Sequence, residues 1–268
     1  MSPFPLILAL GCSKPDPADT AADTKWWELE PQSPSWGPED FAATIEAQVD
    51  AGLPTPAPFA AAYAQALANG SEDCPGTTSQ ITLSEGCTAT SGWYYSGVAH
   101  YFMDSYSIQL LADMSIVSPE GQRMWGGGGM QHQVIVDSLS TTWRVDINGS
   151  WGWSGGEGWM EEGIGSLLSI TGNDDASGRQ LTVDGSLEDA GRALSLASLS
   201  WSTTGCWEYP SGTLLARDDI GGWYRLVLNC EPCGTVKHLD TDTALGEVCL
   251  DLTPMRNQVD ALSTLESP

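Results

Sequence analysis

Hydrophobic residues recur with two different periods along the chain, and the change of period separates a short helical part from a long β part. Near the N-terminus, Phe41, Ile45 and Val49 follow one another at four-residue spacing. This spacing places them on one face of a helix. Pro38 suits the first helical position and Gly52 suits the end, so we predict a helix between them.

A second stripe of the same period follows. Phe59, Tyr63 and Leu67 share one helical face, after Thr55-Pro56 and before Asn69-Gly70. Both helices are short, and we expect them to form a small helical segment that packs on the main domain.

From about residue 80 the period changes from four to two. Alternation is clearest at residues 108–116, 143–147 and 181–187, where apolar side chains share one side of a strand. Turn-forming groups separate the alternating segments: Pro119-Glu120-Gly121, Asn148-Gly149, Asp174 to Gly178, Asp189-Ala190-Gly191, Pro210-Ser211-Gly212 and Gly221-Gly222. Connections this short leave no room for crossover helices, so neighbouring strands must run antiparallel. The predicted fold class is mainly β: an antiparallel meander of roughly ten strands that forms a sandwich, a barrel or a curved sheet.

Composition narrows the range of partners. The 268 residues include 35 acidic and 10 basic side chains, and the formal net charge is −25. A surface field of this sign repels phosphate backbones and anionic lipid headgroups, so we expect no nucleic-acid partner. Twelve tryptophans and 41% apolar residues supply enough hydrophobic surface for a real core.

A short apolar run at the N-terminus ends in Ala9-Leu10-Gly11-Cys12 and is followed by a stretch rich in Pro and Asp. This arrangement resembles the lipobox of bacterial lipoproteins, in which Leu, then Ala or Ser, then Gly or Ala precede the cysteine that receives a diacylglycerol. Gly11 and Cys12 match that pattern, whereas Ala9 and Leu10 stand in unusual order. The run is also shorter than a usual signal peptide and has no positive charge.

The resemblance implies an exported, extracytoplasmic protein that is held to a membrane by a lipid on Cys12. Because Ser13 rather than Asp follows that cysteine, it also implies the outer membrane, on its periplasmic or surface face. No segment has the roughly 20 apolar residues of a membrane-spanning helix. The predicted divisions are a signal peptide at 1–11, the lipidated cysteine and a disordered tether at 12–35, two short helices at 36–70, an antiparallel β domain at 71–254 and a C-terminal tail at 255–268.

Six further cysteines indicate disulfides in an oxidising compartment, because their number is even and they accompany an export signal. They are Cys74, Cys87, Cys206, Cys230, Cys233 and Cys249. The first two lie apart from the rest, and we pair them. The other four allow three pairings, of which we favour Cys206–Cys230 and Cys233–Cys249 because each would join neighbouring strands.

The same four cysteines could instead hold zinc. Cys230 and Cys233 have the close spacing of a zinc knuckle, but a second paired motif is missing. We therefore expect no metal site and no cofactor.

Tryptophans offer the main candidate binding surface. Trp151, Trp153 and Trp159 have the same parity, so the first two would face the same way on a strand. A row of exposed indoles could stack on sugar rings; alternatively, these rings fill the core of the sheet. Trp125 and Trp143 lie in the same glycine-rich third of the chain.

One motif suggests catalysis. Residues 152–156, Gly-Trp-Ser-Gly-Gly, match the G-x-S-x-G pattern of serine hydrolases, with Ser154 as the nucleophile. His100, His132 and His238 could each supply a base. The segment lies between β-patterned stretches and has no helix signal after it, so we expect a coincidental match and no catalytic residue.

Two further clusters could hold ions. Gly126 to Gly129 could cradle an anion with backbone amides, but the expected structure is a flexible hairpin loop. His238, Asp240, Asp242 and Glu247 form an acidic cluster that could hold calcium. The spacing of an EF-hand is missing there, so solvated turns are expected.

These observations predict a lipid-anchored protein whose domain has a binding or structural role rather than an enzymatic one. The sequence does not specify the ligand or the protein partner. Carbohydrate binding by the three tryptophans is the first alternative, and serine hydrolysis is the second.

Overall fold

The structure is a computed structural model and describes residues 33–78, 81–189 and 192–265. The fold given below is that of the unit that begins at Ser33. The predicted signal peptide, the lipidation site at Cys12 and most of the predicted tether lie outside the described residues.

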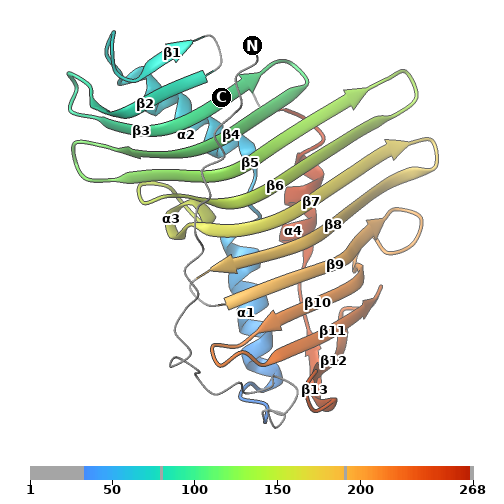
Figure 1. The fold of residues 1–268 in the computed structure, drawn as a ribbon. Coiled ribbons are helices and arrows are strands. Elements are labelled where there is room, and N and C mark those ends of the chain that lie inside the picture. Colours follow the sequence, from blue (N-terminus) through green and yellow to red (C-terminus); the bar gives the residue numbers. More distant parts are fainter. Residues whose placement is uncertain (1–32, 79–80, 190–191, 266–268) are drawn as a thin grey trace, which may run out of the picture. The chain divides into compact units, whose positions relative to one another are not determined.

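Thirteen antiparallel strands form one sheet, and their order in space is their order along the chain (Figure 1). Among the described strands, β1 and β13 are the two edges and do not pair with each other, so the sheet is open. The predicted antiparallel meander is confirmed, as one unclosed sheet. The strands are β1 (Gly76–Thr78), β2 (Ile81–Thr88), β3 (Tyr94–Met103), β4 (Ser107–Val117), β5 (Arg123–Val136), β6 (Thr141–Trp153), β7 (Ile164–Asp175), β8 (Gly178–Asp189), β9 (Arg192–Ser202), β10 (Ser211–Arg217), β11 (Trp223–Asn229), β12 (Cys233–His238) and β13 (Thr243–Cys249).

Helices cover one face of this sheet (Figure 1). They are α1 (Pro38–Ala51), α2 (Pro56–Ala68) and α4 (Thr253–Ala261), while the one-turn helix α3 (Trp159–Glu162) connects β6 to β7. Alternate residues of the central strands point into a single hydrophobic core beneath the helices. The residues between them point away from the core, on the side that we call the outer face.

The two predicted N-terminal helices are confirmed. The Asp40 side chain accepts a hydrogen bond of 2.8 Å from the Gly37 amide and caps the start of α1. The predicted stripe of α1 is buried, and so are two residues of the α2 stripe: Phe41, Ile45, Val49, Phe59 and Tyr63. The hydroxyl of Tyr95 on β3 donates to the Ala66 carbonyl at 2.6 Å, which joins α2 to the sheet.

Three disulfides have the predicted pairing: Cys74–Cys87, Cys206–Cys230 and Cys233–Cys249. The last pair lies directly opposite on β12 and β13. Zinc binding requires thiolates, and all four cysteines of the zinc alternative are used in disulfides. Three disulfides indicate an oxidising, extracytoplasmic location.

Two glycine segments that the sequence predicted as turn or loop lie inside long strands. Asn148-Gly149 belongs to β6, and Gly126 to Gly129 belong to β5. At Gly149, φ is +102° and an added Cβ would lie 1.9 Å from the Gly127 carbonyl oxygen. Both predictions are wrong because glycine here permits a bent backbone and close approach of neighbouring strands within the sheet.

The segment expected to be a C-terminal tail begins within helix α4, which is docked on the sheet by side-chain hydrogen bonds. The indole Nε1 of Trp143 donates to the Val259 carbonyl at 3.2 Å, and His132 Nε2 donates to the Leu262 carbonyl at 2.9 Å. Arg179 forms an ion pair of 2.6 Å with Asp260. In the described part of the chain, no helix combines the length and apolar character that crossing a bilayer requires.

Replacing Gly149 by Ala tests whether the bend of the sheet depends on glycine. We expect Gly149→Ala to lower the free energy of unfolding by about 2 kcal/mol or more, because the new Cβ meets backbone and φ is positive. Gly127→Ala, by contrast, should raise it by about 0.5–1 kcal/mol, because that site has open space and φ outside the left-handed region. Urea unfolding of both variants measures the difference, and equal effects would contradict this account.

Stability should also depend on the protonation of His132. Burial lowers the pKa of His132, and the hydrogen bond to Leu262 offsets this only in part. Below about pH 6.5 the unfolded chain takes up a proton that the folded protein resists, so the free energy of unfolding falls as the pH falls. The slope contributed is at most about 1.4 kcal/mol per pH unit.

The variant His132→Gln removes this titration. Its free energy of unfolding should therefore depend less steeply on pH between about pH 6.5 and pH 5. Urea unfolding at several pH values measures the slope. His100→Gln, at a partly exposed position of β3, is the matched control. An unchanged slope in His132→Gln would refute the assignment.

Candidate functional site

The tryptophans that the sequence offered as a binding row face the core. Trp151 is fully buried and Trp159 is 7% exposed, while Trp153 packs partly buried against the core. Phe59 of α2 contacts the Trp151 ring edge-on at 5.2 Å and stacks on Trp159 at 6.3 Å. The alternative in which these indoles form an exposed row is contradicted, and the alternative in which they fill the core is confirmed for Trp151 and Trp159, which pack against Phe59 of α2.

Ser154 is not part of a catalytic arrangement. Its hydroxyl accepts a hydrogen bond of 2.7 Å from the Arg123 amide across the β5–β6 pair. Within the described ranges no histidine forms a hydrogen bond with Ser154; His132 is bound to Leu262, and His238 Nδ1 lies 2.9 Å from the Thr241 hydroxyl. A nucleophile without a base at hydrogen-bond distance has no activation, so the motif lacks the geometry of a hydrolase.

A different group of Ser, Asp and His residues meets in the interior. Asp218, which follows β10, is 1% exposed. Its carboxylate accepts hydrogen bonds from the Gly222 amide at 2.6 Å, from the Tyr224 hydroxyl at 2.9 Å and from the Ser35 hydroxyl. His238 is fully buried, and its Nε2 has no hydrogen-bond partner among the described residues.

This buried cluster has a structural role. Burial alone would raise the pKa of Asp218, but the hydrogen bonds from Ser35, Tyr224 and two backbone amides outweigh it and lower the pKa. The Ser35 hydroxyl donates to a carboxylate and not to an imidazole, so no base activates it. Tyr224 also accepts hydrogen bonds from the amides of Ser35 and Trp36, at 2.9 and 3.0 Å. The cluster therefore fixes the start of the described chain on β10 and β11, across 183 residues of sequence.

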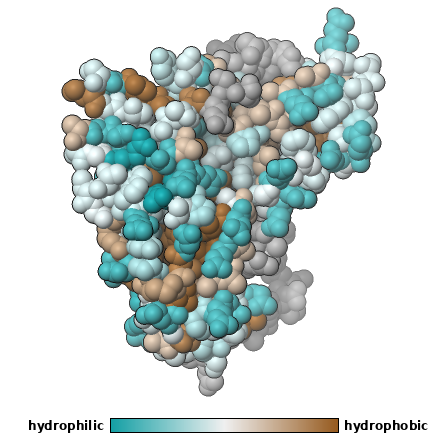
Figure 2. Space-filling view, turned by 180° about the vertical axis from the view of Figure 1, so that it is seen from behind, coloured by the Kyte–Doolittle hydropathy of each residue, from teal (hydrophilic) through white to brown (hydrophobic). Residues whose placement is uncertain are grey.

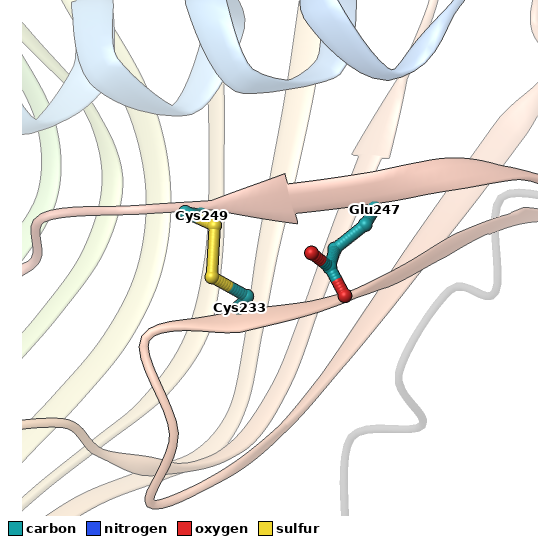
Figure 3. A group of neighbouring side chains, drawn as sticks. All are labelled: Cys233, Glu247 and Cys249. Carbon is teal, nitrogen blue, oxygen red and sulfur yellow. A yellow bond between two sulfur atoms is a disulfide. The ribbon is translucent and has the colours of Figure 1, made fainter.

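The predicted acidic cluster near the C-terminus is not assembled. His238 points into the core, whereas Asp242 is exposed and pairs with Lys237 at 3.3 Å. Glu247 lies beside the Cys233–Cys249 disulfide, and the three side chains place potential ligand atoms within 4.8 Å of one another (Figure 3). Because both sulfurs are bonded to each other, one exposed carboxylate remains, which is not a metal site.

A polar row crosses the outer face of the central strands, and sequence reasoning missed it. Five outward side chains stand directly opposite one another on β4 to β8: Gln109, Gln131, Asp146, Ser169 and Asp184. The row could not be found from periodicity, because alternation shows that these residues point outward but not which of them are neighbours.

Neighbouring groups hold several of these side chains in place. Asp146 accepts hydrogen bonds from Arg144 Nε at 2.6 Å and from the Ser169 hydroxyl at 2.9 Å. Asp184 accepts one from the Ser198 amide at 2.6 Å. Side chains ordered in this way lose little conformational entropy on binding a ligand.

Two shallow depressions lie side by side on this face and share Asp146 and Asn148. One has a volume of about 290 Å³ and lies over Gly129 beside Leu111. The other has a volume of about 350 Å³ and lies beside Leu167. The two leucines are 57% and 67% exposed, so each depression combines polar groups with an accessible aliphatic side chain.

The surface over Gly129 continues along β5 to Trp125. Between them, a Cβ added at Gly127 would have no heavy atom within 4 Å, and its backbone lies outside the positive-φ region. The fold therefore does not require glycine at this position. We define the outer-face site as Trp125, Gly127, Gly129 and Gln131 of β5 with Leu111 of β4 and Asn148 of β6.

Exposed hydrophobic residues of the described chain also lie outside these two depressions. Hydrophobic residues lie among hydrophilic ones on the side turned away from the viewer of Figure 1 (Figure 2). Val136 and Leu139, at the β5–β6 hairpin, are 62% and 83% exposed. These two residues line neither depression.

Comparison with protein-family models, with curated proteins and with solved structures found no match to this chain. The function is therefore inferred from the geometry alone.

Proposed function

We propose that this chain is a lipid-anchored, extracytoplasmic binding protein that holds a ligand at its outer-face site and catalyses no reaction. The observation that supports this best is the depression over Gly129, where ordered polar groups and an exposed leucine converge. Binding sites combine apolar contact with a few fixed polar groups in this way. Long paired strands on both sides keep the site rigid.

The location is supported by two independent features. Three disulfides suit an oxidising compartment. The resemblance of Ala9-Leu10-Gly11-Cys12 to a lipobox supplies the anchor, and Ser13 favours the outer membrane.

Two candidate nucleophiles, one suggested by the sequence and one by the structure, support the absence of catalysis. Ser154 is bound to a backbone amide. Ser35 is bound to the buried Asp218 carboxylate. Neither has a base positioned to remove its proton.

Mass spectrometry of the native protein tests the anchor. We expect an N-terminus that begins at Cys12 and carries a diacylglycerol, and we expect Cys12→Ser to remain unlipidated and leave the membrane fraction. Detection of intact Met1 on an unmodified chain would contradict the proposal.

Hydroxyl-radical footprinting tests the binding site without knowledge of the ligand. The full chain is oxidised alone and with the envelope fraction of its source cells, and side-chain oxidation is read by mass spectrometry. We expect Leu111 and Trp125 to be protected by the envelope fraction, whereas Leu139, at the β5–β6 hairpin, keeps its reactivity. Equal reactivity of all three with and without the fraction would refute a ligand at the outer-face site.

A further inference from the structure

We infer that the ligand of the outer-face site is an uncharged, hydroxyl-rich glycan, with one sugar ring on the indole of Trp125 and the next over Gly127 and Gly129. This ligand class rests on the proposed function and names what the site binds. Four features of the described residues support it: a flat aromatic platform, an open backbone floor, oriented amide groups and the sign of the surrounding charge.

The indole of Trp125 lies flat on the outer face. A Cβ added at Gly152, directly opposite on β6, would lie 2.2 Å from Trp125 Cζ2, and one added at Gly163 would lie 2.4 Å from the same atom. The ring therefore covers the backbone of β6 and of the residue before β7, and only glycine permits this. One face of the ring rests on the protein, and the side chain is partly exposed. The guanidinium of the exposed Arg123 lies over the ring at 5.9 Å from its centroid, so a sugar that stacks on the indole would displace this side chain. A flat apolar ring parallel to the surface is suited to the C–H face of a sugar.

Beside this indole, β5 carries glycine at its outward positions, although the fold does not require glycine at every one of them. Gly126 is required, because a Cβ there would lie 2.5 Å from Trp151, and Gly128 has φ of +138°. Gly127 has neither constraint, whereas at Gly129 an added Cβ would lie 3.0 Å from Leu111 Cδ2 and 3.3 Å from Asn148 Oδ1, so these two side chains already border that position. Glycine in a strand interior weakens the strand, and close approach of a ligand is one reason to keep it. The open lane from Trp125 to Gly129 spans five residues, or about 13 Å between the first and last Cα atoms.

Amide side chains line the depression, and the side chain of Asn148 is held in a fixed orientation. Its Oδ1 accepts a hydrogen bond of 2.7 Å from the Gly129 amide, which leaves its Nδ2 group to donate to a ligand. Gln131 and Gln109 lie in the same depression, and Ser150 is exposed on β6 beside Gly127. Carboxamides and hydroxyls that both donate and accept complement the hydroxyl groups of a sugar.

The surrounding charge selects an uncharged ligand. The chain has 35 acidic and 10 basic residues, and Asp113 stands directly opposite Gly127. This field repels polyuronates and phosphate polymers. The size of the depression, about 290 Å³, is near that of sites for small ligands, whereas a protein partner needs roughly 800 Å² of contact surface.

Binding of the full chain to glycans of known composition tests this inference. The probes are insoluble and soluble neutral glycans, namely β-linked glucan, α-linked glucan, mannan and N-acetylglucosamine polymer, with a polyuronate as the anionic comparison. We expect retention on at least one neutral glycan and none on the polyuronate. Retention on the polyuronate alone, or on none of the probes, would overturn the ligand class.

Two variants test whether the glycan binds at the outer-face site. Gly127→Val adds a side chain where an added Cβ would meet no heavy atom within 4 Å. It should weaken binding about tenfold or more while the melting temperature stays equal or rises. Trp125→Ala should have a similar effect on binding through loss of the stacking surface.

The matched controls are Thr171→Val, an exposed outward residue of β7, and Trp223→Ala, on β11. Trp223 is a fair control because it is partly exposed and carries Arg217 over its ring at 5.7 Å, as Trp125 carries Arg123 at 5.9 Å. Both controls should bind like the unaltered chain. Glycan binding that Gly127→Val leaves intact would overturn the assignment to this site.

The glycan-binding and footprinting results together distinguish a failure of the ligand class from a failure of the proposed function. If no glycan binds but the envelope fraction still protects Trp125 and Leu111 in footprinting, the site holds another class of ligand, such as a protein, and the glycan inference is wrong. If neither occurs, the proposed function itself fails.

Discussion

An open antiparallel sheet can bury only the face that other elements cover, and this constraint organises the described unit. The thirteen-stranded meander has no closing strand pair, so helices from both ends of the chain supply the cover. Phe59 of α2 packs on Trp151, and Trp143 holds α4 through the Val259 carbonyl. The hydrogen bonds of the Asp218 cluster also attach the segment before α1 to this unit. Without these contacts the inner face would lie exposed to water, at a large cost in hydrophobic free energy.

The same constraint leaves the outer face available for function. Strand β5 lies between two long partners, so its backbone hydrogen bonds are satisfied even where it carries glycine. The absence of an outward side chain at Gly127 therefore does not break the sheet, and it leaves open space over the backbone there. The paired strands on both sides keep this face rigid. In the proposed binding function, the depressions, the ordered carboxamide of Asn148 and the indole of Trp125 would contact the ligand.

Local patterns predicted much of the fold. The four-residue stripes identified both N-terminal helices, and period-two alternation identified the antiparallel meander. The cysteine spacing led to the three disulfide pairs that the structure contains. The two misplaced turns have one physical cause, which is that glycine permits turns, bends and close packing alike. Asn148-Gly149 and Gly126 to Gly129 have the composition of turns, yet contacts with other strands place them inside β6 and β5.

The sequence by itself determined the class of fold, the oxidising surroundings that suit the disulfides and the direction in which strand residues alternate, because these depend on neighbours in the chain. It could not determine which side of each strand meets a helix. That choice was made by tertiary packing, which buried Trp151 and Trp159 under α2 and left Trp125 outside. It also could not align residues of five strands into one polar row, because register between strands is set by packing over the whole sheet and not by any single segment.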